Sequence, residues 1–165
     1  MNRVNIKYIL FILLALVFQA TFSANLKIYI WRPDFVMIAL VMFSLRRENK
    51  AALTAGFASG LLQDLLSTHF LGLAALCKTV ASAVVCGLRG KFSSRAEFVL
   101  ILLIASLIHD FLYFLIYGFG ESFQLRTLFF LYAIPNALYT LLVGIFIHFL
   151  LYDWLENLPG ERIEL

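Results

Sequence analysis

Charged residues are scarce in this chain, and those present are grouped between long apolar runs. They make up 14% of the 165 residues, whereas apolar residues make up 62%. Soluble domains are closer to half apolar. No polar stretch is long enough to fold by itself, so we expect one integral membrane domain over residues 1–165. The net charge of +3 resides mainly in short loops, which favours an orientation signal over a nucleic-acid surface.

Cysteine, histidine clusters and catalytic signatures are also sparse. Cys77 and Cys86 are nine residues apart in one apolar segment, so on a helix they point to opposite sides and cannot form a disulfide. The three histidines belong to separate segments, which argues against a metal site. The sequence has no HExxH, GxSxG or P-loop motif. We therefore expect neither an enzyme nor a metal or cofactor.

Long apolar runs dominate what remains. A helix needs about 20 residues to span a bilayer, and the second and third runs are short by that measure. The fold class predicted is all-α, a membrane bundle of about six transmembrane helices, the first of them uncleaved. The expected segments are Ile6–Ala24, Pro33–Leu45, Ala51–Leu66, Phe70–Leu88, Phe98–Phe119 and Leu125–Leu151.

Basic residues are distributed unevenly between the two predicted ends of these spans. Cytoplasmic loops of membrane proteins carry an excess of Lys and Arg. If the N-terminus is cytoplasmic, nine basic residues lie inside and three outside, and Lys78 lies within a span. The bias predicts that both termini are cytoplasmic. The inner set is Arg3, Lys7, Arg46, Arg47, Lys50, Arg89, Lys91, Arg95 and Arg162, and the outer set is Lys27, Arg32 and Arg126.

Small residues and one carboxylate share a face of the third apolar segment. Gly56, Gly60 and Asp64 follow each other at intervals of four, so on a helix they point to nearly the same side, and Gly72 follows a short polar break. Glycines allow a neighbouring helix to approach closely. The face is predicted to be a helix-packing or partner interface. Asp64 either orders the adjacent turn through the amides of Ser67 and Thr68 or faces a partner protein.

The second segment begins with a helix-start signal, Arg32-Pro33-Asp34. Proline suits the first turn of a helix, and an acidic residue is favourable at its N-terminus. Trp31, near the predicted membrane edge, fits interfacial anchoring.

Polar residues interrupt three of the predicted spans. Lys78, Asp110 and Asn136 lie roughly 12 to 15 Å from the outer ends of their helices at about 1.5 Å per residue, and His109 precedes Asp110. Charges inside a membrane usually face the protein interior in pairs. We expect a Lys78–Asp110 pair with Asn136 nearby, either as a structural cluster or as a proton path or ligand pocket.

Pro135 is expected to bend the last helix, because proline removes one helical hydrogen bond. The carbonyl left without its amide needs another donor. Asn136 and Lys78 are the candidates that the sequence offers.

Several of these features together resemble one family. They are RPDFVMIALVMFSLRR, GFASGLLQDLLSTHFLGLAAL, a basic loop and a late PNALY. This order resembles MreD, a small membrane protein of the bacterial rod-shape system. Arg32, Pro33, Gly56, Gly60, Asp64, Leu65, Gly72 and Leu73 match its motifs over about residues 6–150. The Ser67–Phe70 stretch departs from the small residues and proline that are frequent there.

The resemblance implies a non-enzymatic scaffold in the bacterial inner membrane. MreD-like proteins bind MreC and help to organise an elongation machinery that includes MreB, RodA and a penicillin-binding transpeptidase. The family fold is similar to the S components of energy-coupling-factor transporters. That similarity implies the alternative function, a vitamin-binding transport subunit. Such a subunit needs a polar and aromatic pocket near its outer face, where this sequence has few candidates.

Overall fold

The computed structural model describes residues 3–22, 25–67, 70–93, 96–118 and 125–156. Within these ranges the protein is all-helical, as predicted, and the only β-type pairing is an isolated bridge between Ile28 and Trp31. The helices are α1 (Arg3–Phe22), α2 (Phe35–Ser44), α3 (Asn49–Leu66), α4 (Leu73–Leu88), α5 (Glu97–Tyr117), α6 (Leu125–Thr127), the π-helix η1 (Leu128–Ala133) and α7 (Ile134–Glu156).

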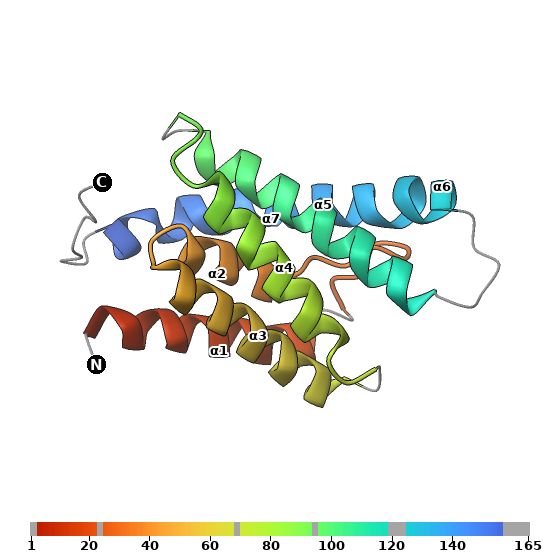
Figure 1. The fold of residues 1–165 in the computed structure, drawn as a ribbon, viewed down its shortest axis with the longest axis horizontal. Helices are drawn as coiled ribbons and strands as arrows, with labels where there is room; N and C mark the ends of the chain where they lie inside the picture. Colours follow the sequence, from red (N-terminus) through yellow and green to blue (C-terminus); the bar gives the residue numbers. More distant parts are fainter. Residues whose placement is uncertain (1–2, 23–24, 68–69, 94–95, 119–124, 157–165) are drawn as a thin grey trace.

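Successive helices run in alternating directions along the long axis of the molecule (Figure 1). The short α6, η1 and α7 follow one another without a break, so they act as one long final helix. The start of α1 and the end of α7 lie at the same end of the bundle, as do the α2–α3 and α4–α5 connections (Figure 1). The segment that leads into α2 and the α3–α4 connection lie toward the other end.

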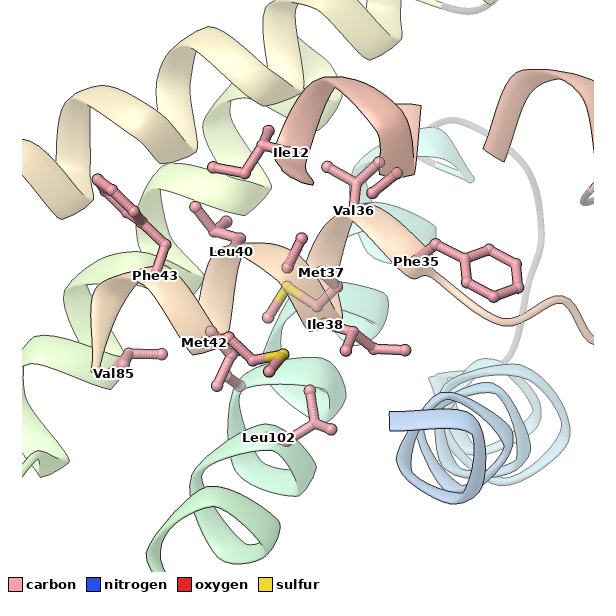
Figure 2. Close-up of a cluster of buried hydrophobic side chains, with 14 of the residues drawn as sticks. Ile12, Phe35, Val36, Met37, Ile38, Leu40, Met42, Phe43, Val85 and Leu102 are labelled. Carbon is pink, nitrogen blue, oxygen red and sulfur yellow. The ribbon is translucent and has the colours of Figure 1, made fainter. Parts of the chain in front are cut away.

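The short helix α2 is the centre of the core. All ten of its residues are buried, and it contacts α1, α3, α4, α5 and α7. Figure 2 shows its side chains radiating in several directions, with Ile12, Val85 and Leu102 around them. A helix that is apolar on every side must be enclosed by protein or lipid. Here protein encloses it, which explains why the second apolar run could remain short.

Two helical stretches are long and apolar enough to cross a membrane, Glu97–Tyr117 and Leu128–Leu151. Shorter apolar helices cover Lys7–Phe22, Phe35–Ser44 and Leu73–Leu88. At about 1.5 Å per residue, α2 is only about 15 Å long, half of a typical hydrocarbon core. The six-span arrangement therefore stays a prediction, whereas the six apolar runs do coincide with helices.

Candidate functional site

The glycines of α3 lie where its backbone meets that of α4. A Cβ atom added at Gly60 would lie 2.5 Å from the Ala75 Cα and from the Ala74 carbonyl oxygen. One added at Gly56 would lie 2.8 Å from the Lys78 carbonyl oxygen and would also meet the Ser82 hydroxyl. Atoms that are not bonded do not approach so closely, so only glycine fits at either position. The predicted small-residue face is thus used within the chain, between α3 and α4.

Asp64 continues this face and binds the beginning of α4. Its carboxylate accepts hydrogen bonds from the amides of Gly72 at 2.9 Å, Ala74 at 3.0 Å and Ala75 at 3.1 Å. Gly72 has a φ of +99°, a left-handed conformation that favours glycine. Asp64 is 3% exposed, so its carboxylate is used within the chain.

The sequence suggested different partners for this carboxylate. Ser67 donates from its amide and hydroxyl to the main-chain oxygen of Asp64 rather than to the carboxylate, and Thr68 lies outside the described residues. The acceptors are instead directed at the next helix. Amides in a first helical turn have no intrahelical acceptor, and the helix dipole favours an anion there. The Asp64 side chain therefore stabilises α4 in two ways, by accepting hydrogen bonds from its first amides and by placing a negative charge at its N-terminus.

Asp34 performs a similar task at the start of α2 and also forms a buried ion pair. Its carboxylate accepts from the Met37 amide at 2.8 Å, which makes Asp34 the N-cap of α2. The Arg32-Pro33-Asp34 motif thus lies at a helix start, but Pro33 precedes the helix and does not lie in its first turn as predicted. Its second oxygen lies 2.5 Å from Nζ of Lys78, whose side chain is fully buried. The partner of Lys78 is therefore Asp34, on α2, rather than the predicted Asp110, on α5.

Asp110 is paired differently, although it belongs to the same neighbourhood. One of its oxygens lies 3.0 Å from Nδ1 of His109, the residue before it. It remains close enough to Lys78 and Asp34 to interact with both electrostatically. The structure thus brings Lys78, His109 and Asp110 together with Asp34, but the direct contacts are Lys78–Asp34 and His109–Asp110.

Three polar side chains from other helices bind the non-helical backbone that enters α2. Asn136 accepts from the Arg32 amide at 3.1 Å, and Thr140 accepts from the Asp34 amide at 3.1 Å. Gln19 accepts from the Phe35 amide at 2.9 Å. Unpaired backbone amides are costly away from water, so irregular backbone at membrane depth requires such partners. We call this backbone, residues 31–35, the α2 entry. Asn136 therefore binds the α2 entry and not the Lys78 ion pair.

The α2 entry also compensates for the proline of α7. Pro135 has no N–H group, and in an α-helix that group would bond to the carbonyl four residues earlier, that of Leu131. The indole Nε1 of Trp31 donates to this carbonyl oxygen at 2.9 Å. The donor is thus Trp31 rather than Asn136 or Lys78.

Sequence reasoning missed Gln19, Thr140 and Arg89. Arg89 donates from its guanidinium to the carbonyls of Ser44 and Arg47 and to the side chain of Asn49. Gln19 and Thr140 are polar residues within otherwise apolar segments, and that signal could have identified them as bonding residues. Nothing comparable distinguishes Arg89 from the other basic residues of the loops.

The described residues contain no cluster that could hold a metal ion. A hollow of about 510 Å³, lined by Arg126, Thr127, Phe130 and Leu131, opens at the surface next to η1. The polar cluster around Asp34 does not line it. The direct bonds of that cluster, between Asp34 and Lys78 and between the α2 entry and Gln19, Asn136 and Thr140, join α1, α2, α4 and α7. Nε2 of His109 on α5 is buried and has no hydrogen-bond partner among the described residues.

Comparison with known protein families decides the classification. A family profile described as rod shape-determining protein MreD matches residues 2–159. The chain belongs to the MreD family. No curated protein and no solved structure gives a significant match.

MreD membership agrees with the helical fold and the two membrane-length helices, and together they make this a membrane protein. It also assigns the chain to a family of shape-determining proteins, which are generally non-enzymatic. The match covers every element of the bundle, including the glycine face of α3, the Asp34 entry and the proline of α7.

Proposed function

We propose that this protein is a non-enzymatic scaffold of the rod-shape machinery in the bacterial inner membrane. In this proposal it binds an MreC-like protein and helps to organise lateral peptidoglycan synthesis with MreB, RodA and a penicillin-binding transpeptidase. The observation that carries the proposal is the MreD match over residues 2–159. The role of its polar interior supports it, because Asp34, Asp64 and Lys78 all bond to groups on other elements.

The proposed scaffold is one domain over residues 1–165, with six spans and both termini in the cytoplasm. The alternating helix directions support this topology, since α1 begins and α7 ends at one end of the bundle (Figure 1). The distribution of basic residues supports the same orientation. The proposed roles of the site residues are internal. Gly56, Gly60, Asp64 and Gly72 join α3 to α4, and Arg32, Pro33 and Asp34 begin α2 with support from Lys78, His109, Asp110 and Asn136.

The alternative is a vitamin-binding S component, whose fold the MreD family is expected to share. The scaffold proposal is preferred to it because the buried carboxylates are already bonded to amides and to Lys78. The surface hollow beside η1 offers one cation and one hydroxyl, Arg126 and Thr127, among apolar neighbours. Tight vitamin recognition usually needs an enclosed pocket with several converging polar groups.

The test is co-purification of the tagged protein with an MreC-like protein from a detergent extract, with an unrelated single-pass membrane protein as control. We expect stoichiometric retention of the MreC-like protein alone. Calorimetric titration of the purified protein with thiamine, riboflavin and biotin should show no nanomolar binding. Tight binding of one vitamin together with no retention of the MreC-like protein would replace the scaffold with the transport subunit.

A further inference from the structure

Five basic residues are held together at the end of the bundle where α2 and α4 finish and α3 begins. We call them the basic cluster: Arg46, Arg47, Lys50, Arg89 and Lys91. Arg46 and Arg47 belong to the α2–α3 connection, Lys50 to the first turn of α3, and Arg89 and Lys91 to the α4–α5 connection. The two connections are about 40 residues apart in the sequence and lie at the same end of the molecule (Figure 1).

Arg89 joins the two connections. Its guanidinium donates to the Ser44 carbonyl at 3.1 Å and to the Asn49 side chain at 3.0 Å, and it also bonds to the Arg47 carbonyl. These contacts hold Arg89 at the end of α4, two residues before Lys91, against the connection and the helix start that precede Lys50. Because carbonyl partners do not neutralise a guanidinium, Arg89 adds its positive charge to the cluster.

Acidic residues offset only part of this charge. Within or directly after the two connections, the described acidic residues are Glu48, which is exposed and makes no side-chain bond to the start of α3, and Glu97, which accepts from the Gly90 amide at 2.5 Å, so five basic residues stand against two acidic ones. Lys50 and Lys91 are both exposed. The cluster therefore presents net positive charge to its surroundings.

An exposed strip of small residues on α4 leads away from the cluster. Ala83 and Gly87 are one helical turn apart and exposed, and a Cβ atom added at Gly87 would meet nothing within 4 Å. Phe57 is exposed on the neighbouring helix α3. An amphiphile whose anionic group contacts Lys50 and Lys91 thus has open apolar surface beside it for an alkyl chain.

We propose that the basic cluster is a docking site for the headgroup of an anionic phospholipid. In the proposed six-span topology, on which this assignment rests, the cluster lies where helices end, at the depth of the lipid phosphates. Lysine and arginine near an anionic leaflet are attracted to it, and basic pockets between helices bind anionic headgroups. The adjoining apolar strip favours a lipid over a soluble anion of the same charge.

The test compares lipid affinities of the full-length protein in detergent by native mass spectrometry. The probes are phosphatidylglycerol and phosphatidylcholine with identical acyl chains. The test variant is Lys50→Gln/Lys91→Gln, and the matched control, Lys27→Gln/Arg126→Gln, removes two exposed lysine or arginine charges outside the cluster. We expect wild type to prefer phosphatidylglycerol, the test variant to lose roughly tenfold in affinity for it, and the control to change less than about twofold.

Each remaining outcome overturns the assignment. Equal affinity for the two lipids would show that the headgroup charge is not recognised. Equal losses in both variants would show a general charge effect rather than a site. Displacement of the lipid by excess inorganic phosphate would make this a phosphate site. Unchanged lipid affinity in the test variant, with loss of a co-purifying acidic protein, would assign the cluster to a protein partner.

Discussion

Three acidic residues lie next to helix N-termini, and the extent of their burial decides how much each should stabilise the fold. Asp34 and Asp64 are largely buried and accept amide hydrogen bonds at the starts of α2 and α4. Glu48 precedes α3, but it is exposed and makes no such bond. A carboxylate is most valuable where water cannot replace it, because the amides that it satisfies would otherwise be buried and unpaired.

The contrast between Asp64 and Glu48 gives a direct comparison. Asp64→Asn keeps the size of the side chain but removes one acceptor oxygen and turns an NH₂ group toward amide donors. We expect a loss of about 3 kcal/mol in unfolding free energy in detergent. Glu48→Gln should change it by less than about 0.5 kcal/mol. Similar small effects for both would show that the Asp64 carboxylate does not bind the start of α4.

The Asp34–Lys78 ion pair predicts strong coupling between two residues. Lys78→Met and Asp34→Asn each leave a buried charge without its partner, and asparagine can still cap α2. Each single change should cost about 3 kcal/mol or more, and the double variant less than the sum. Unfolding free energies of the four proteins measure the coupling.

A second cycle, with Lys78→Met and Asp110→Asn, serves as the comparison for that pair. It should show the weaker coupling, because Asp110 contacts His109 directly. Stronger coupling of Lys78 to Asp110 than to Asp34 would contradict the contacts observed here.

At the scale of elements, α3 and α4 approach so closely that a methyl group cannot be added between them. Gly60→Ala should lower the unfolding free energy by about 2 kcal/mol or more, because the backbone atoms of Ala74 and Ala75 cannot move aside. The matched control is Gly87→Ala on the open side of α4, which should be neutral or stabilise by about 0.5 kcal/mol. Equal tolerance at both positions would show that the two helices are not in backbone contact.

The bond between the Trp31 indole and α7 predicts that a second substitution can compensate for its loss. Trp31→Phe removes the indole donor of the Leu131 carbonyl and should cost about 2 kcal/mol. In a Pro135→Ala background that cost should fall by about 1 kcal/mol, since the new amide at position 135 can bond to the same carbonyl. The measurement is a double-mutant cycle of unfolding free energies, and strictly additive losses would contradict the link.

At the scale of the whole molecule, the alternating helix directions predict a specific topology. Reporter fusions after Asn49 and at the C-terminus should have cytoplasmic activity, and a fusion after Gly118 should have periplasmic activity. Asn49 begins α3 at the basic end of the bundle, and Gly118 follows α5 at the other. A periplasmic C-terminus would exclude the six-span proposal.

The sequence predicted the elements well because long apolar runs, proline and glycine act locally. Each of the six runs contains a helix, and the Arg32-Pro33-Asp34 motif directly precedes α2, which begins at Phe35, two residues after the helix start that was expected at Pro33. The spacing of Gly56 and Gly60 correctly indicated a close helix contact. These signals need no knowledge of which helices are neighbours.

The choice of bonding partner was less predictable for a physical reason. Depth estimates placed Lys78 and Asp110 at the same level, but depth along a helix says nothing about the side on which a residue lies relative to α2. The sequence assigned Asp34 only an electrostatic benefit at the helix start, whereas in the structure its second oxygen also binds Lys78. Likewise, the donor for the Leu131 carbonyl comes from a loop 100 residues earlier.

The polar entry to α2 therefore has a consequence in time as well as in space. The residues that satisfy the Arg32 and Asp34 amides, Asn136 and Thr140, follow them by 104 and 106 residues. At the usual pace of about 5 to 20 residues per second, the ribosome needs roughly 5 to 20 s to make them. The last helix synthesised is thus the one that completes the first loop. In a chain cut short before α7, the Arg32 and Asp34 amides would lack these acceptors. Membrane quality control can recognise such unpaired polar groups.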